Sequence, residues 1–167
     1  RSVSRGLGDV YKRQGHYQML QVAEEITGKI GDFELTLRNS EKPDLDYLSV
    51  QECLAKMTDR NVWLTNQANF SAKAELFPGA TFVLGADTLV RIGELRFYEE
   101  NPAKLAAAVS RLATLDVSFL VLGRIVGNRF ISLDDIKLPT PLRALCQGVP
   151  ESVYRNDISS TRIRAKR

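Results

Sequence analysis

Histidine and cysteine are scarce in this sequence, and their scarcity excludes several kinds of site. The chain has one histidine, His16, and two cysteines, Cys53 and Cys146, which lie far apart. These are too few ligands for a zinc site, and two cysteines cannot form a disulfide framework. We therefore expect both thiols to be reduced, as in a cytoplasmic protein. The sequence also contains neither a G-x-x-x-x-G-K-S/T phosphate loop nor a G-x-S-x-G nucleophile elbow.

Long apolar runs are absent as well. No run approaches the roughly 20 residues needed to span a membrane, and no segment resembles a secretory signal. A length of 167 residues, with 44% hydrophobic and 26% charged side chains, is typical of one globular domain. Residues 1–14 hold four basic side chains and one acidic one, which accounts for the whole net charge of +3. The remainder is balanced, so we expect neither a nucleic-acid nor a membrane partner.

The N-terminal segment, RSVSRGLGDVYKRQ, shows no hydrophobic periodicity and does not lead into a predicted element. Residues 4–14 resemble one reading frame of a common transposon-type sequencing adapter. We therefore interpret residues 1–14 as a non-native, adapter-like segment that does not contribute to the fold. Gly6 and Gly8 are then no dinucleotide-binding loop, and Tyr11 stands where G-x-G-x-x-G would need its third glycine. The domain is expected to cover residues 15–167.

From residue 16 onward, helical and strand patterns alternate. The apolar spacing and the helix-start signals predict helices beginning at His16, Tyr47, Phe70 and Asn101. Strands are predicted at residues 33–37, 62–65, 82–84 and 119–122, the first half-buried and the last covered on both faces. Residues 123–156 are expected to be mostly irregular, before a final element near Ser159. The alternation predicts an α/β fold with an open, mainly parallel sheet and helices on both faces.

The end of the sequence carries the strongest candidate for a binding site. Ser159, Ser160 and Thr161 open the final predicted element, where hydroxyls and free backbone N–H groups at the positive end of a helix bind anions. Arg164 follows Thr161 by three residues and so projects from the same face, where its guanidinium can hold phosphate in a bidentate way. The alternative is an ordinary helix cap with a solvated basic tail.

Two motifs at opposite ends of the sequence resemble one family. Residues 159–164 are similar to the S-x-T-x-x-R signature of the adenylyltransferase branch of the nucleotidyltransferase superfamily, and residues 158–161 are closest to nicotinate- and nicotinamide-nucleotide adenylyltransferases. Gly15 and His16 match the last two residues of that family's H-x-G-H motif, whose first histidine falls on Arg13. The resemblance covers residues 15–167. It implies a Rossmann-like fold whose first strand is here missing or replaced.

The resemblance also implies roles for individual residues. His16 and Arg164 would be catalytic, stabilising the charge on the phosphates of ATP. The residues implied to bind ATP and its phosphates are Gly15, His16, Gly85, Asp87, Ser159, Ser160, Thr161 and Arg164. Lys42 and Thr65 would lie near the second substrate. Mg²⁺ would arrive with ATP, bridging phosphate oxygens and needing few protein ligands.

The implied reaction is adenylyl transfer from ATP to a mononucleotide, such as nicotinate or nicotinamide mononucleotide, with release of pyrophosphate. Two alternatives remain: a non-catalytic, nucleotide-binding regulatory module of the same fold, and a cytidylyl- or phosphopantetheine-type transferase. Because the first strand and the first histidine of the motif are lacking, we expect this chain to be incomplete, inactive and marginally folded, although its parent protein is an enzyme. The sequence does not specify the acceptor or the oligomeric state.

Overall fold

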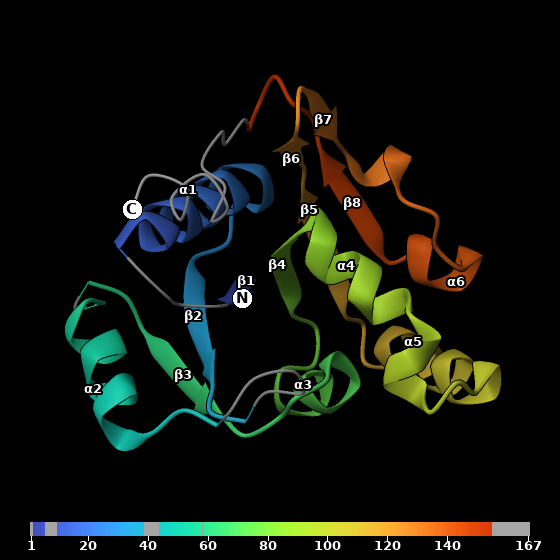
Figure 1. The fold of residues 1–167 in the computed structure, drawn as a ribbon, viewed down its shortest axis with the longest axis horizontal. Coiled ribbons are helices and arrows are strands. Elements are labelled where there is room, and N and C mark those ends of the chain that lie inside the picture. Colours follow the sequence, from blue (N-terminus) through green and yellow to red (C-terminus); the bar gives the residue numbers. More distant parts are fainter. Residues whose placement is uncertain (1, 6–9, 39–43, 58, 155–167) are drawn as a thin grey trace.

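The computed structural model describes residues 2–5, 10–38, 44–57 and 59–154. These residues form an α/β fold around a six-stranded sheet in the order β3-β2-β1-β4-β5-β8 (Figure 1). The strands are β1 (Ser2–Arg5), β2 (Gly31–Thr36), β3 (Val62–Thr65), β4 (Thr81–Gly85), β5 (Ser118–Leu122) and β8 (Cys146–Val149). All neighbouring strands of this sheet are parallel, so they end at one common edge. The predicted α/β class is confirmed.

Helices connect the strands and cover both faces of the sheet. They are α1 (Val10–Thr27), α2 (Tyr47–Ala55), α3 (Phe70–Leu76), α4 (Ala86–Gly93), α5 (Pro102–Thr114) and α6 (Thr140–Arg143), with 3-10 turns η1 (Leu95–Tyr98) and η2 (Leu133–Asp135). Within the described ranges, no helix is both long and apolar enough to cross a membrane. Asn101 begins α5 as expected, because its side chain accepts a hydrogen bond from the Ala103 amide at 2.9 Å.

Each face of the sheet has its own core, because successive strand residues point to opposite sides. On one face, β4 and β5 pack against α3, α4 and α5 through Phe82, Phe119, Phe70, Leu89 and Leu112. On the other face, Val83 and Leu120 pack against Ala23 of α1. Burying one large apolar side chain contributes about 1.5–3 kcal/mol, so these contacts hold the helices to the sheet.

The N-terminal segment contradicts the expectation that it does not lead into an element. Ser2–Arg5 forms β1, which pairs in parallel with β2 on one side and β4 on the other. Val10 begins α1, so the helix starts earlier than the predicted position at His16. Backbone pairing depends little on side-chain identity, and the polar backbone groups of β2 and β4 need partners. The place of the first strand is therefore filled, and the reason for expecting a marginal fold is removed.

Up to residue 154, the segment predicted at 123–156 is also more regular than expected. It contains the antiparallel hairpin β6 (Arg124–Val126) and β7 (Arg129–Ile131), then η2, α6 and the edge strand β8. The sequence of β8, CQGV, has a weak strand pattern, and its strand conformation comes from pairing with β5. The prediction of an irregular segment is wrong because this pairing is a tertiary contact.

Helix α2 is present where the spacing predicts it, yet its apolar face is not covered. None of its residues is buried, and Tyr47 and Leu48 are 73% and 69% exposed. Asp46 caps the helix by accepting from the Ser49 amide at 2.7 Å. Met57, two residues after the end of the helix, is instead the buried residue that packs with Leu20 and Phe33.

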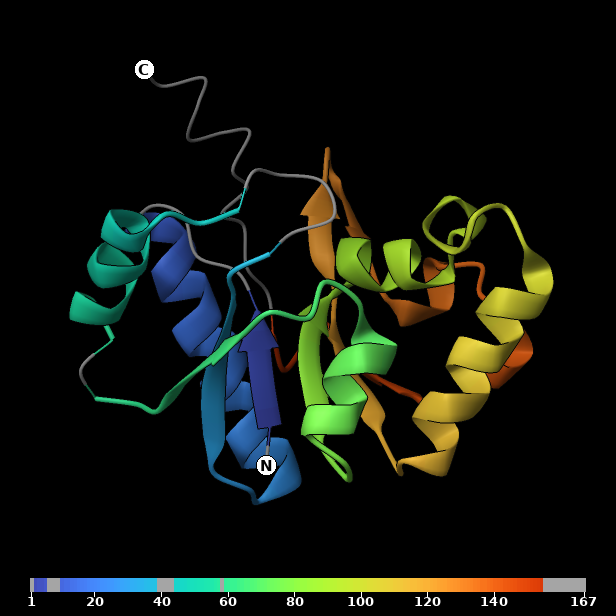
Figure 2. The same ribbon diagram turned by 90° about the horizontal axis from the view of Figure 1, so that it is seen from below.

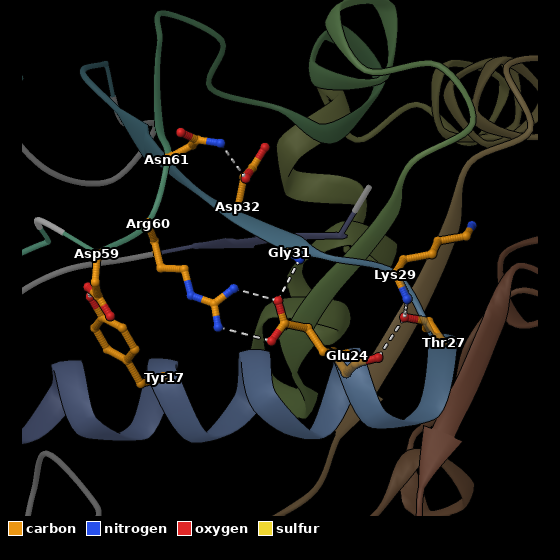
Figure 3. A network of polar contacts seen from close by, with 10 residues as sticks. Tyr17, Glu24, Thr27, Lys29, Gly31, Asp32, Asp59, Arg60 and Asn61 are labelled. Atoms are coloured by element: carbon orange, nitrogen blue, oxygen red, sulfur yellow. Dashed lines mark hydrogen bonds and ion pairs between the residues drawn. The ribbon is translucent and has the colours of Figure 1, made fainter.

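An ion pair at the opposite, amino-terminal edge of the sheet ties α1 to the segment before β3. Arg60 donates to both carboxylate oxygens of Glu24, at 2.7 and 3.1 Å, and the Gly31 amide donates to Glu24 at 2.8 Å (Figure 3). Burial by itself would raise the pKa of Glu24, but the Gly31 amide and the Arg60 guanidinium together hold it below its ordinary value. The ionised carboxylate is therefore the form that this clamp stabilises.

We predict that Glu24→Gln lowers the free energy of unfolding by about 1 kcal/mol at pH 7, since the amide loses the charge-assisted bonds. A carboxyl whose pKa is depressed on folding contributes stability at pH values above its unfolded pKa, which is about 4.3 for glutamate. That stability is lost as the pH falls through the folded pKa. Urea unfolding at pH 7 and pH 3 should show a smaller difference between parent and variant at pH 3 than at pH 7. An equal difference at both pH values would contradict this role.

Candidate functional site

The candidate site lies at the edge of the sheet where the parallel strands end. Its position along that edge is given by the point between β1 and β4 at which the strand order reverses. From β1 the sheet extends through β2 to β3, whereas β4, on the other side of β1, leads to β5 and β8. In open parallel sheets, ligands bind outside the carboxyl ends of the strands at this reversal, where the two connecting segments leave in opposite directions. Figure 2 shows that the β6–β7 hairpin projects beyond the sheet at the end toward which β1 points. The ends of β1 and β4 therefore define the site.

Gly85 and Asp87 lie at this reversal, at the end of β4 and in the first turn of α4. Gly85 ends β4 and is the N-cap of α4, with an extended backbone and no side-chain cap, and a Cβ added to it would contact nothing within 4 Å. Asp87 occupies the first turn of α4, where the helix dipole favours a carboxylate. Its carboxylate forms an ion pair with the Arg124 guanidinium of β6. This contact ties the hairpin to the start of α4.

Gly15 and His16 lie inside α1 and not at its first residue. The helix begins at Val10 and follows β1, so its first turns start at the same edge of the sheet as Gly85. His16 is partly buried and comes six residues after Val10. Arg13 precedes His16 by three residues in the same helix, so these two positions share one helix face.

Thr65 is buried and belongs to a polar cluster that the sequence analysis missed. We call Glu34, Thr36, Thr65 and Lys73 the Glu34 cluster. Lys73 of α3 donates to Glu34 Oε2 at 2.6 Å and also to the Thr36 hydroxyl. Thr36 donates to Glu34 Oε1 at 2.6 Å, and the Thr65 hydroxyl donates to the same oxygen. Glu34 and Lys73 are 2% and 0% exposed, so the whole pair is enclosed in the protein.

Strand β2 is buried on both faces, which corrects the prediction that it is half-buried. Its polar residues Asp32, Glu34 and Thr36 point to one face and are 4%, 2% and 8% exposed. Asp32 accepts from the Asn61 amide and from the Trp63 indole N–H, at 3.2 and 2.9 Å. Alternation of apolar and polar residues was interpreted as contact with solvent, whereas each polar group here has a protein partner.

Neither cysteine has the lowered pKa that is typical of a nucleophilic thiol. Both are present as free thiols, as expected. Burial raises the pKa of Cys146 to about 11, and it also raises the pKa of Cys53 above its ordinary value. Thiols that are protonated at neutral pH are poor nucleophiles. Among the described residues, no group of three or more His, Cys, Asp or Glu side chains could hold a metal ion.

Several predicted site residues lie outside the described residues. These are Lys42, Ser159, Ser160, Thr161 and Arg164. Their proposed contacts with phosphate and with the second substrate stay predictions. The structure thus brings Gly85, Asp87 and the start of α1 to one edge of the sheet, and it encloses Thr65 beneath the ends of β2 and β3.

Comparison of the chain with models of known protein families, with curated proteins and with solved structures found no match.

Proposed function

We propose that this chain is a nucleotidyltransferase domain with a Rossmann-like fold, from an enzyme that transfers the adenylyl group of ATP to a mononucleotide such as nicotinate or nicotinamide mononucleotide and releases pyrophosphate. The observation that carries the proposal is the order of the parallel strands, which reverses between β1 and β4. This is the strand order of dinucleotide-binding sheets, and it gives the start of α1 and Gly85 a common edge. The helix that carries Gly15 and His16 begins at this edge, and so does the helix that carries Asp87.

The proposed chemistry needs no protein nucleophile. A phosphate oxygen of the mononucleotide attacks the α-phosphorus of ATP in line, a new P–O bond forms, and the bond to pyrophosphate breaks. The protein contributes positioning and stabilisation of the charge that moves to the leaving group. His16 would donate to oxygens of the α- and β-phosphates, while Ser159, Ser160, Thr161 and Arg164 would hold the β- and γ-phosphates.

The substrate would be the magnesium complex of ATP, in which the cation bridges phosphate oxygens and disperses their charge. The described residues provide no cluster of acidic, histidine or cysteine side chains for the ion, so we derive no step through a protein-held metal. Asp87 is a carboxylate at this edge, and Arg124 already pairs with it.

Arg13 favours a second candidate function, a nucleotide-binding module without catalysis. It stands where the family motif has its first histidine. We therefore expect this chain to bind ATP while transferring the adenylyl group slowly or not at all. Placing histidine at position 13 then separates an impaired enzyme from a binding module.

The proposal is tested by titrating the full chain with MgATP and with nicotinamide mononucleotide in separate calorimetric experiments. We expect a site for each ligand, and we expect ATP to bind more tightly than CTP. Preference for CTP, or for phosphopantetheine over the mononucleotide, would support the related transferases instead. Absence of ATP binding by the folded chain would overturn the proposal.

A further inference from the structure

The Glu34 cluster joins three elements on the side of the sheet formed by β2 and β3, across β1 from β4. Glu34 and Thr36 belong to β2, Thr65 ends β3, and Lys73 comes from the second turn of α3. Thr36 and Thr65 are direct neighbours in the parallel register, and each is the last residue of its strand. Both hydroxyl protons point to the same oxygen of Glu34, while Lys73 holds the other oxygen. The cluster therefore fixes the side-chain rotamers of both strand ends and the position of α3.

Stability alone does not explain why this site is ionic. The same face of the sheet at β4 is filled by Phe82 and Leu84, which pack in the apolar core. Replacing a buried ion pair by apolar side chains of similar volume is often neutral or stabilising, because the desolvation of both charges is avoided. What the ionic cluster provides, and an apolar core would not, is a directional arrangement of hydrogen bonds between particular atoms.

The position of the cluster indicates which ligand it would serve. The residues implied to contact ATP lie at the start of α1 and at the end of β4. The ends of β2 and β3 lie on the other side of β1 from β4. The loop after β3 runs directly to Asn69, which caps α3 by accepting from the Ala72 amide at 2.8 Å. The cluster thus fixes the ends of β2 and β3, which lie beside the expected ATP position. It does not contact the end of β4, where ATP is expected.

We propose that Glu34, Thr36 and Lys73 are positioning residues for the mononucleotide acceptor and not for ATP. This inference rests on the proposed function, because it assigns the second substrate of that reaction to the ends of β2 and β3. The residues act from beneath, through the conformation of these strand ends. Removing the hydrogen bonds of the cluster should therefore weaken binding of the mononucleotide while leaving binding of ATP unchanged.

Two variants of the full chain test the inference, with nicotinamide mononucleotide and MgATP as the probes. Thr36→Val removes one hydroxyl without changing the side-chain shape or leaving a charge unpaired. The double variant Glu34→Gln, Lys73→Met removes both charges together. We expect each variant to raise the Kd for the mononucleotide about tenfold, as loss of well-placed hydrogen bonds does, with the Kd for ATP within about twofold of the parent. Thr36→Ser should restore the parent affinity.

A matched control comes from the opposite edge of the sheet. Glu24→Gln breaks the Arg60 ion pair, and it should leave both Kd values unchanged. Thermal unfolding of each variant shows whether it is folded, and if the double variant unfolds, Thr36→Val decides. If the parent binds both ligands and Thr36→Val raises both Kd values equally or neither, the positioning role is wrong while the proposed function stands. If the parent binds no ATP and no mononucleotide, both proposals fail.

Discussion

Replacing Arg13 with histidine should raise the rate of dinucleotide synthesis from ATP and nicotinamide mononucleotide by about 100-fold or more. Positions 13 and 16 lie three residues apart in α1, so the substitution places two imidazoles on one helix face. Such a pair can donate to phosphate oxygens as negative charge develops on the leaving pyrophosphate. Pyrophosphate release under saturating ATP and mononucleotide measures the effect.

The control for this gain is Arg13→Gln, which removes the arginine without supplying an imidazole. We expect this variant to remain as slow as the parent. If Arg13→Gln is accelerated as much as Arg13→His, the arginine merely obstructs the site. If neither is accelerated although ATP still binds, the chain is a nucleotide-binding module and not an impaired enzyme.

In the Arg13→His background, Arg164→Ala should lower kcat/KM by a factor of roughly 100 to 1,000. This corresponds to about 2.7–4 kcal/mol of transition-state stabilisation, the loss found when one charge-stabilising donor is removed. The guanidinium is expected to neutralise the β- and γ-phosphates more strongly as the bond to the α-phosphorus breaks. Steady-state kinetics with ATP as the varied substrate separate kcat from KM.

Arg167→Ala is the matched control, since Arg167 lies in the same basic tail but outside the S-x-T-x-x-R motif. We expect its kcat/KM to stay within about twofold of the background, because the motif gives Arg167 no contact with the phosphates. Equal losses in the two variants would show that the tail acts through general positive charge, and the motif assignment would then be wrong.

Elements with strong local signals could be predicted from the sequence. The continuous apolar run of β5 and the apolar centre of β4 are typical of buried parallel strands, and the structure buries both on both faces. Asn101 with Pro102 predicts the start of α5, because the side-chain cap and the missing proline amide are properties of neighbouring residues. The predicted strand at residues 62–65 is also confirmed. Its signal is local as well, because its apolar residues follow directly on one another.

Features that depend on distant partners could not be predicted. Burial of Glu34 requires Lys73, which lies 39 residues away in the sequence and is itself fully buried. Nothing in the alternating pattern of β2 distinguishes a carboxylate that faces water from one that faces a lysine. The strand state of Ser2–Arg5 likewise depends on two neighbours that are supplied from elsewhere in the chain.

The candidate site divides in the same way. The glycine and the acidic residue after β4 could be singled out from their sequence, but helix α4, which begins directly after Gly85, is not among the predicted helices. The pairing of Asp87 with Arg124 spans 37 residues and was not foreseen. Thr65 was expected near the second substrate, and the structure places its hydroxyl against Glu34, so a role through positioning fits its burial better than direct contact.

The central claim is that the imidazole of α1 and the hydroxyl-rich, arginine-bearing segment at residues 159–164 bind one triphosphate. Because His16 is the chain's single histidine, its ring gives one unambiguous set of nuclear magnetic resonance signals, and Arg164→Lys identifies the Arg164 side-chain signal by its loss. On titration with MgATP, the signals of His16 and Arg164 should shift together and report the same Kd. Saturation of one signal while the other stays unchanged would show that the two groups do not share a ligand, and it would contradict the account.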